Sequence, residues 1–114
     1  LALLLFVAPA REAQSQQTPK LASWRCTLPG LSDPITFIYN LANNTGLIVG
    51  NVGTTPAEVK LGNEAISFIE VVSTGAVQTL TIKLTDGISV YSRHSIIDDK
   101  FSASQVQGDC KRTD

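Results

Sequence analysis

The chain has 114 residues, with nine basic and ten acidic side chains and a formal net charge of −1. A chain of this length fits one domain with a single hydrophobic core. Its charges are balanced and form no basic cluster. Electrostatic attraction to nucleic acid or to anionic lipid therefore has no source, and we expect neither as a partner.

The first segment, residues 1–10, is an apolar run that is too short to span a bilayer. Small residues follow it, as in the cleavage region of a secretory signal peptide. The sequence has no methionine and no basic segment before the run, so we expect residues 1–15 to be a truncated signal peptide. Cleavage after Ser15 is preferred, and cleavage after Ala10 is the alternative. The protein is therefore predicted to be exported, to the periplasm or the extracellular space.

Two cysteines, Cys26 and Cys110, stand near the two ends of the expected domain. In an exported chain, a disulfide between them is the simplest interpretation, and the alternatives are a free thiol pair or a metal site. Two sulfurs and one distant histidine fall short of the usual four zinc ligands, so we expect no metal and no cofactor. The residues before Cys26 are Ser-Trp-Arg, which is not a lipid-attachment box, so no membrane anchor is expected.

The rest of the chain has the pattern of an all-β domain. Short runs rich in β-branched and aromatic residues alternate with clusters of Gly, Asn, Asp and Pro, and no window has a long 3.6-residue apolar period. We expect a flexible N-terminus over residues 16–20, a single β domain over residues 21–110 and a polar tail over residues 111–114.

The alternation predicts short strands along the whole domain, and we expect seven or eight of them to build the barrel. Strands are expected over 22–28, 35–41, 47–52, 57–61, 65–73, 77–85 and 88–93, with a last short pair at 95–97 and 101–104. The cleanest hairpin signal is Asp86-Gly87 between two alternating runs. This number of strands in a small domain favours a closed or nearly closed antiparallel barrel, with a two-sheet sandwich as the alternative.

His94 is the only histidine, and it has Ser92 and Ser95 nearby with Asp98 and Asp99 a few residues on. A Ser-His-Asp triad needs a nucleophile on a sharp turn with an oxyanion hole beside it, and no glycine-rich elbow accompanies these serines. The carboxylates of the chain are scattered. We therefore expect no catalytic residues and a protein that is not an enzyme.

A candidate binding surface involves Tyr91, Arg93 and the adjacent His94. Tyrosine and arginine are common at the centres of protein interfaces, and the alternation predicts that Tyr91 and Arg93 share one outward face of a strand. The alternative is structural: Trp24 fills the core beside the disulfide, and Tyr91 is an ordinary half-buried strand residue.

Several segments carry a resemblance: Trp24-Arg25-Cys26, residues 66–70 (Ile-Ser-Phe-Ile-Glu), residues 92–95 (Ser-Arg-His-Ser), Ser104-Gln105 and residues 108–110 (Gly-Asp-Cys). Together they resemble an uncharacterised family of small exported bacterial β-rich proteins. The likeness covers most of the chain after residue 15. It implies export and the terminal disulfide, and it implies no activity.

A looser similarity links the chain to the periplasmic C-type lysozyme inhibitors, which are small disulfide-closed β-barrels. Their inhibitory segment, of the type Ser-Gly-x-x-x-Arg-Tyr, is not reproduced, because Arg93 is followed by His94. No residue roles are carried over from that family.

The function expected from the sequence is an exported, non-catalytic β-barrel module that binds a protein or envelope component, with hydrolase inhibition as one form of it. A small-ligand carrier with a pocket inside the barrel is the alternative. A third hypothesis is hydrolysis through His94. We expect the protein to be a monomer.

Overall fold

A computed structural model describes residues 20–114 of the chain. The expected signal peptide, residues 1–15, lies outside the described residues, as does the expected flexible N-terminus except for Lys20. Within residues 20–114 there is no helix with the length and apolar character needed to cross a membrane.

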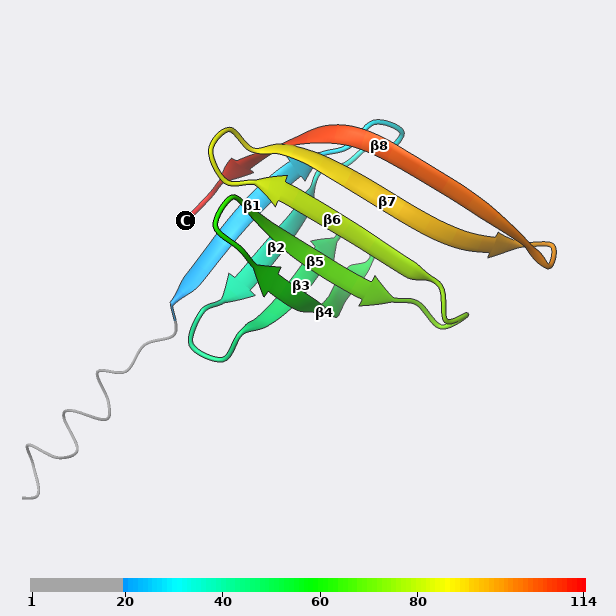
Figure 1. The fold of residues 1–114 in the computed structure, drawn as a ribbon, viewed down its shortest axis with the longest axis horizontal. Helices are drawn as coiled ribbons and strands as arrows, with labels where there is room; N and C mark the ends of the chain where they lie inside the picture. The colour runs from blue at the N-terminus through cyan, green and yellow to red at the C-terminus, as the bar shows by residue number, and fades with distance from the viewer. Residues whose placement is uncertain (1–19) are drawn as a thin grey trace, which may run out of the picture.

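Eight antiparallel strands form a closed barrel in which each strand pairs with the next along the chain and β8 returns to pair with β1 (Figure 1). The strands are β1 (Leu21–Thr27), β2 (Ile35–Asn40), β3 (Thr45–Gly50), β4 (Gly53–Leu61), β5 (Ala65–Val71), β6 (Val77–Lys83), β7 (Ile88–Ile97) and β8 (Lys100–Arg112). The predicted all-β barrel is confirmed, and the sandwich alternative is wrong.

The largest departure from the expected strands is the last hairpin. The sequence predicts a strand over 88–93 and a separate short pair, whereas β7 and β8 form one long hairpin that projects beyond the rest of the barrel (Figure 1). Asp98 and Asp99 make its turn, with φ of 49° and 64°, as a type I′ turn requires. β8 also continues through Arg112, into the expected tail. Residues 105–109 lack large alternating side chains, so their strand was not visible in the sequence.

The core fills the barrel interior with the inward-facing residues of all strands. Trp24 is only 5% exposed and lies edge-on to Phe68, whose ring also packs against Phe37 at a centroid distance of 5.3 Å. The core position expected for Trp24 in the structural alternative is confirmed. The residues of the hydrophobic core cluster are Ala22, Trp24, Cys26, Leu28, Phe37, Tyr39, Val59, Ile66, Phe68, Leu80, Ile82 and Cys110.

The seam between β1 and β8 is short and carries the disulfide. Only four residue pairs join these strands, from Trp24↔Arg112 to Thr27↔Asp109, and one of them is Cys26↔Cys110. The two cysteines are bonded, with their Cα atoms 4.0 Å apart, and the predicted disulfide is confirmed. It fastens the first strand to the last at the one junction of the barrel that has no connecting loop.

The seam stops where a proline would have to donate a ladder hydrogen bond. Thr113 N–H donates to Ser23 O, so the backbone N–H and C=O groups of the odd-numbered residues of β1 point towards β8. After Thr27↔Asp109, the next hydrogen-bonded position would pair Pro29 with Gln107. Pro29 has no N–H to give, and the chain turns away at Gly30, whose φ is +86°.

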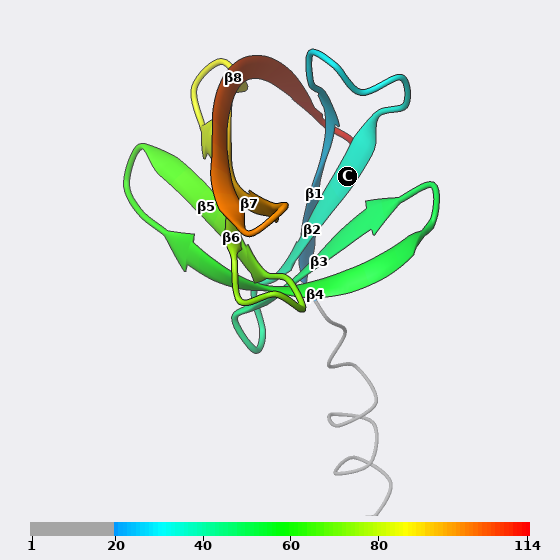
Figure 2. The ribbon, with the colours of Figure 1, turned by 90° about the vertical axis from the view of Figure 1, so that its right-hand side faces the viewer.

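A proline also ends the pairing between β4 and β5. Gly62 N–H donates to Ala65 O, so the backbone N–H and C=O groups of the even-numbered residues of β4 point towards β5. The ladder of paired residues ends at Glu58↔Ile69. The next hydrogen-bonded position would pair Pro56 with Val71, and Pro56 lacks the donor. The barrel therefore divides at this end into two halves, β1–β4 and β5–β8, as seen from that side in Figure 2.

Reduction of the disulfide is predicted to lower the denaturation midpoint. The bond joins residues 84 positions apart, and closing a loop of that length restricts the denatured chain by about 4 to 5 kcal/mol in the chain-entropy model. Thiol titration of the denatured, unreduced protein should find no free sulfhydryl. Two titratable thiols in protein recovered from its natural compartment would contradict both the bond and the predicted export.

Gly46→Ala is predicted to destabilise the fold. Gly46 is buried in β3, where an added Cβ would overlap Val59 Cγ2 and come within 3.2 Å of Phe68 Cδ2. Overpacking of this kind lowers the free energy of unfolding by about 1 to 3 kcal/mol. Chemical denaturation of the variant and the wild type measures this difference. Gly62→Ala is the control, because its nearest neighbour would be Ala65 O at 3.5 Å. Equal stabilities of the two variants would show that the core yields at Gly46.

Candidate functional site

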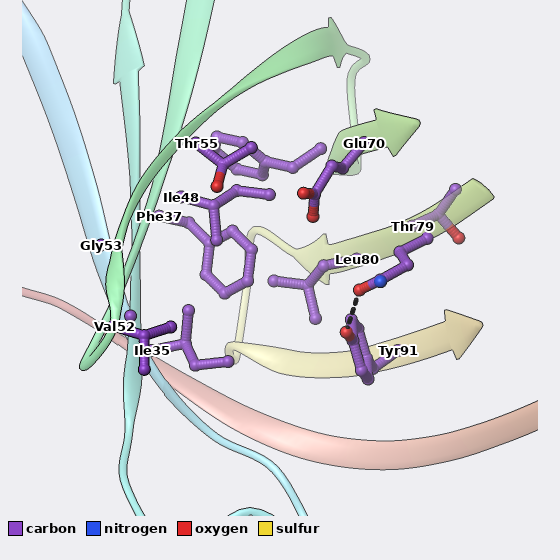
Figure 3. Close-up of a pocket in the computed structure, with 13 residues that line it drawn as sticks. Ile35, Phe37, Ile48, Val52, Gly53, Thr55, Glu70, Thr79, Leu80 and Tyr91 are labelled. Carbon is purple, nitrogen blue, oxygen red and sulfur yellow. Dashed lines mark hydrogen bonds between the residues drawn. The ribbon is translucent and has the colours of Figure 1, made fainter. Parts of the chain in front are cut away.

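An apolar pocket of about 170 Å³ lies where the two halves of the barrel part. It is lined from one half by residues of β2, β3 and β4 and from the other half by residues of β5, β6 and β7 (Figure 3). The lining residues are Ile35, Phe37, Ile48, Gly50, Val52, Gly53, Thr55, Phe68, Glu70, Gln78, Thr79, Leu80 and Tyr91.

Strand alternation places the apolar floor of this pocket. Phe37, Phe68 and Leu80 belong to the buried core, and Ile48 packs against it from β3. Phe68 and Leu80 are direct cross-strand partners, so their inward side chains lie next to each other. The floor is therefore built on strand positions that are paired with a neighbouring strand on both sides.

A row of polar side chains occupies the next inward-facing position of β5, β6 and β7, nearer the opening of the pocket. Glu70 on β5 is the cross-strand partner of Gln78 on β6, which is the partner of Arg93 on β7. These three residues have the same inward parity as Phe68, Leu80 and Tyr91. Glu70 stands on one side of the pocket and Tyr91 on the other, with the apolar floor between them (Figure 3).

Tyr91 links the floor to this polar row. Its hydroxyl donates a hydrogen bond to Gln78 Oε1, drawn as the dashed line in Figure 3. The side chain is half-buried, and this burial raises the pKa of the Tyr91 hydroxyl above 10.0. The nearby Glu70 carboxylate raises the pKa further, while the positive charge of Arg93 acts in the opposite direction.

The structure partly corrects the predicted binding surface. Tyr91 and Arg93 do share one face of β7, but that face is the inner one and not the outward one. Ser89, two residues before Tyr91, is 1% exposed, and Tyr91 packs against the core, as the structural alternative expected. Arg93 lines a smaller hollow beside the β1–β2 loop, where its Nε atom is buried and has no hydrogen-bond partner among residues 20–114.

His94 lies on the opposite face of β7, away from the pocket. It borders a shallow depression on the outer surface together with Ser92, Ala103, Ser104 and Gln105. The structure therefore brings Tyr91 and Arg93 together and separates His94 from them. Within residues 20–114, no group of three or more His, Cys, Asp or Glu side chains could hold a metal ion.

The sequence analysis missed Glu70 and Gln78. A signal was present: Glu70 follows Ile66 and Phe68 at spacings of two, and Gln78 precedes Leu80 and Ile82 in the same way. A polar residue that continues an inward-facing apolar series at the end of a strand marks the mouth of a barrel. The nearly unbroken apolar composition of residues 65–73 concealed this parity.

Comparison with protein-family models, with curated proteins and with solved structures found no match to this chain. The resemblances described from the sequence stay predictions.

The stability of the protein is predicted to fall above about pH 10 through Tyr91. A tyrosine in the unfolded chain ionises near pH 10, whereas the folded protein holds Tyr91 protonated to higher pH. Its contribution is therefore complete below pH 10 and is lost as the pH rises towards the pKa of the folded state. Denaturation midpoints of the wild type and Tyr91→Phe should converge over this range. Curves that stay parallel would contradict the raised pKa.

Proposed function

We propose that the protein is an exported, non-catalytic module that binds a protein partner through the open end of its barrel. One large apolar side chain of the partner enters the pocket between the two halves. The observation that carries this proposal is a preformed apolar pocket, lined by strands and rimmed by exposed apolar residues.

The size of the pocket favours a side-chain anchor over a carried ligand. A cavity of about 150 Å³ accommodates a benzene molecule, so about 170 Å³ suits a single aromatic or branched side chain. Binding sites for drug-sized molecules are usually about 300 to 1,000 Å³. The ligand-carrier alternative requires a larger space than this pocket offers.

The surroundings of the mouth support docking of a larger surface. Val52 on the β3–β4 turn lines the pocket and is 98% exposed. Val52 and Leu31, which lies on the β1–β2 loop, also line a second hollow next to the pocket. Asn51 Nδ2 donates to Asp33 Oδ2, which ties these two loops together. An apolar anchor pocket with a fixed, partly apolar rim is the usual centre of a protein interface.

The non-catalytic part of the proposal rests on where reactive groups lie. The pocket lining holds one carboxylate, Glu70, and one phenol, Tyr91, with no nucleophile and base in contact. His94 faces the outer surface, so the third hypothesis, hydrolysis through His94, has no cleft beside that residue other than a shallow depression.

Export is supported by the disulfide, since such bonds persist in oxidising compartments, and by the apolar run at residues 1–10. A periplasmic or extracellular location is therefore part of the proposal. Inhibition of a wall hydrolase is one activity that such a module would have, with the partner's side chain held in the pocket.

The pocket is tested with p-cresol, a tyrosine side-chain analogue, followed by amide chemical shifts. Gly50→Leu fills the pocket from β3, because a Cβ there meets only Gly53 O at 4.0 Å. Gly62→Leu, on the β4–β5 turn, is the matched control. We expect saturable shifts at Thr79 and Leu80 in the wild type and the control, and an affinity at least about tenfold weaker in Gly50→Leu.

The partner is then sought in envelope extract with the same three proteins, together with assays of lysozyme and other wall hydrolases. A protein retained by the wild type and by Gly62→Leu, but lost with Gly50→Leu, supports the proposal. Equal retention by all three proteins contradicts a role for the pocket. Tighter binding of dodecanoate than of p-cresol, or a small molecule retained in native mass spectrometry, would instead favour the carrier.

A further inference from the structure

Strand β8 leaves most of one edge without a paired strand. It pairs with β7 from Lys100 to Asp109, but with β1 only from Asp109 to Arg112. Along residues 100–108 no other strand of the described chain lies beside this edge. Figure 2 shows the β7–β8 hairpin curving away from β1 on this side.

The hydrogen-bond pattern identifies the groups at this edge. Cys110 N–H donates to Gly87 O on the β7 side, and Thr113 N–H donates to Ser23 O on the β1 side. Since the direction of these bonds alternates along a strand, the backbone N–H and C=O groups of the odd-numbered residues of β8 point towards the open edge. Four residues therefore present N–H and C=O groups there that no backbone group within residues 20–114 pairs: Phe101, Ala103, Gln105 and Gln107.

This edge lacks the features that normally prevent association. Exposed edges are usually interrupted by a charge, a proline or a bulge, whereas residues 101–108 read Phe-Ser-Ala-Ser-Gln-Val-Gln-Gly. Apolar side chains are exposed at the tip of the hairpin, with Phe101 77% and Ile97 58% exposed. The edge is thus long, neutral and open to a further strand.

We propose that two copies of the chain pair through this edge of β8, antiparallel, to form one continuous sheet in the order β7-β8-β8-β7. The sequence alone predicted a monomer. The pairing is independent of the pocket, which lies between the two halves of each barrel.

The register of the pairing follows from which groups are free. A two-fold axis at Ser104 sets Phe101 opposite Gln107 and Ala103 opposite Gln105, so all four edge-facing residues of each copy are used. A shift that involves Asp109 would compete with its existing pairing to Thr27. Ser104 then lies opposite Ser104 of the second copy, and no like charges face each other.

The second copy also fits the exposed apolar residues of the hairpin. Ile96 pairs with Phe101, and Val90 pairs with Gln107, all on the outer face. In the proposed dimer, Phe101 lies opposite Gln107 of the second copy, and Val90 of that copy follows on the next strand. These side chains would cover the exposed side of the Phe101 ring. Each of these three residue positions contributes twice because of the symmetry.

Engineered cross-linking tests the register. Ser104→Cys places two thiols directly opposite each other across the axis, and mild oxidation should give a covalent dimer. Ser102→Cys is the matched control: it lies opposite Val106, four positions from its own counterpart, and should stay uncoupled. Cross-linking of Ser102→Cys as readily as Ser104→Cys would overturn the proposed pairing.

Sedimentation of the unmodified protein tests the dimer itself, over about 10 μM to about 1 mM. Ala103→Pro removes an edge-facing N–H and leaves the bonds to β7 intact, so it should stay monomeric, whereas Ala103→Thr should still dimerise. A wild-type monomer at about 1 mM, or a dimer that Ala103→Pro does not weaken, would overturn the proposal.

Discussion

The backbone hydrogen-bond ladder is the constraint on which the rest of this structure depends. An antiparallel barrel closes only if every strand pairs on both sides, and a proline at a ladder position cannot donate. Pro29 and Pro56 occupy two such positions, at the β1–β8 and β4–β5 junctions. The ladder is therefore complete at one end of the barrel and interrupted twice at the other, and the pocket lies between the two halves that result.

The disulfide offsets the shortness of the seam that this arrangement leaves. Four residue pairs join β1 to β8, and Cys26–Cys110 is one of them, so the covalent bond holds closed a junction that backbone bonds alone join weakly. Arg112 adds to this junction, because its guanidinium lies 5.0 Å from the centre of the Trp24 ring. The core lies towards the end where the ladder is complete, and the pocket lies at the end where it is interrupted.

The sequence predicted the class, the disulfide and most strands, because these follow from alternation, turn residues and cysteine count. It did not predict which face of β7 points inward. Along this strand a serine, Ser89, is buried and an apolar residue, Val90, is partly exposed, so hydrophobicity alone assigns the faces the wrong way round. The pairing of Tyr91 with the buried Leu80 shows which face of β7 points inward. Glu70 and Gln78 were missed for a related reason, since their role depends on three strands meeting.

Amide hydrogen exchange of the Pro56→Ala variant tests most directly whether proline holds this end of the barrel open. The substitution restores an N–H opposite Val71, and we expect the new amide at position 56 to become protected as the β4–β5 ladder extends by one pair. The amide of Ser32, in the exposed β1–β2 loop, is the fast-exchanging reference in the same variant. Exchange at position 56 as fast as at Ser32 would contradict the claim that the missing proline N–H ends the ladder.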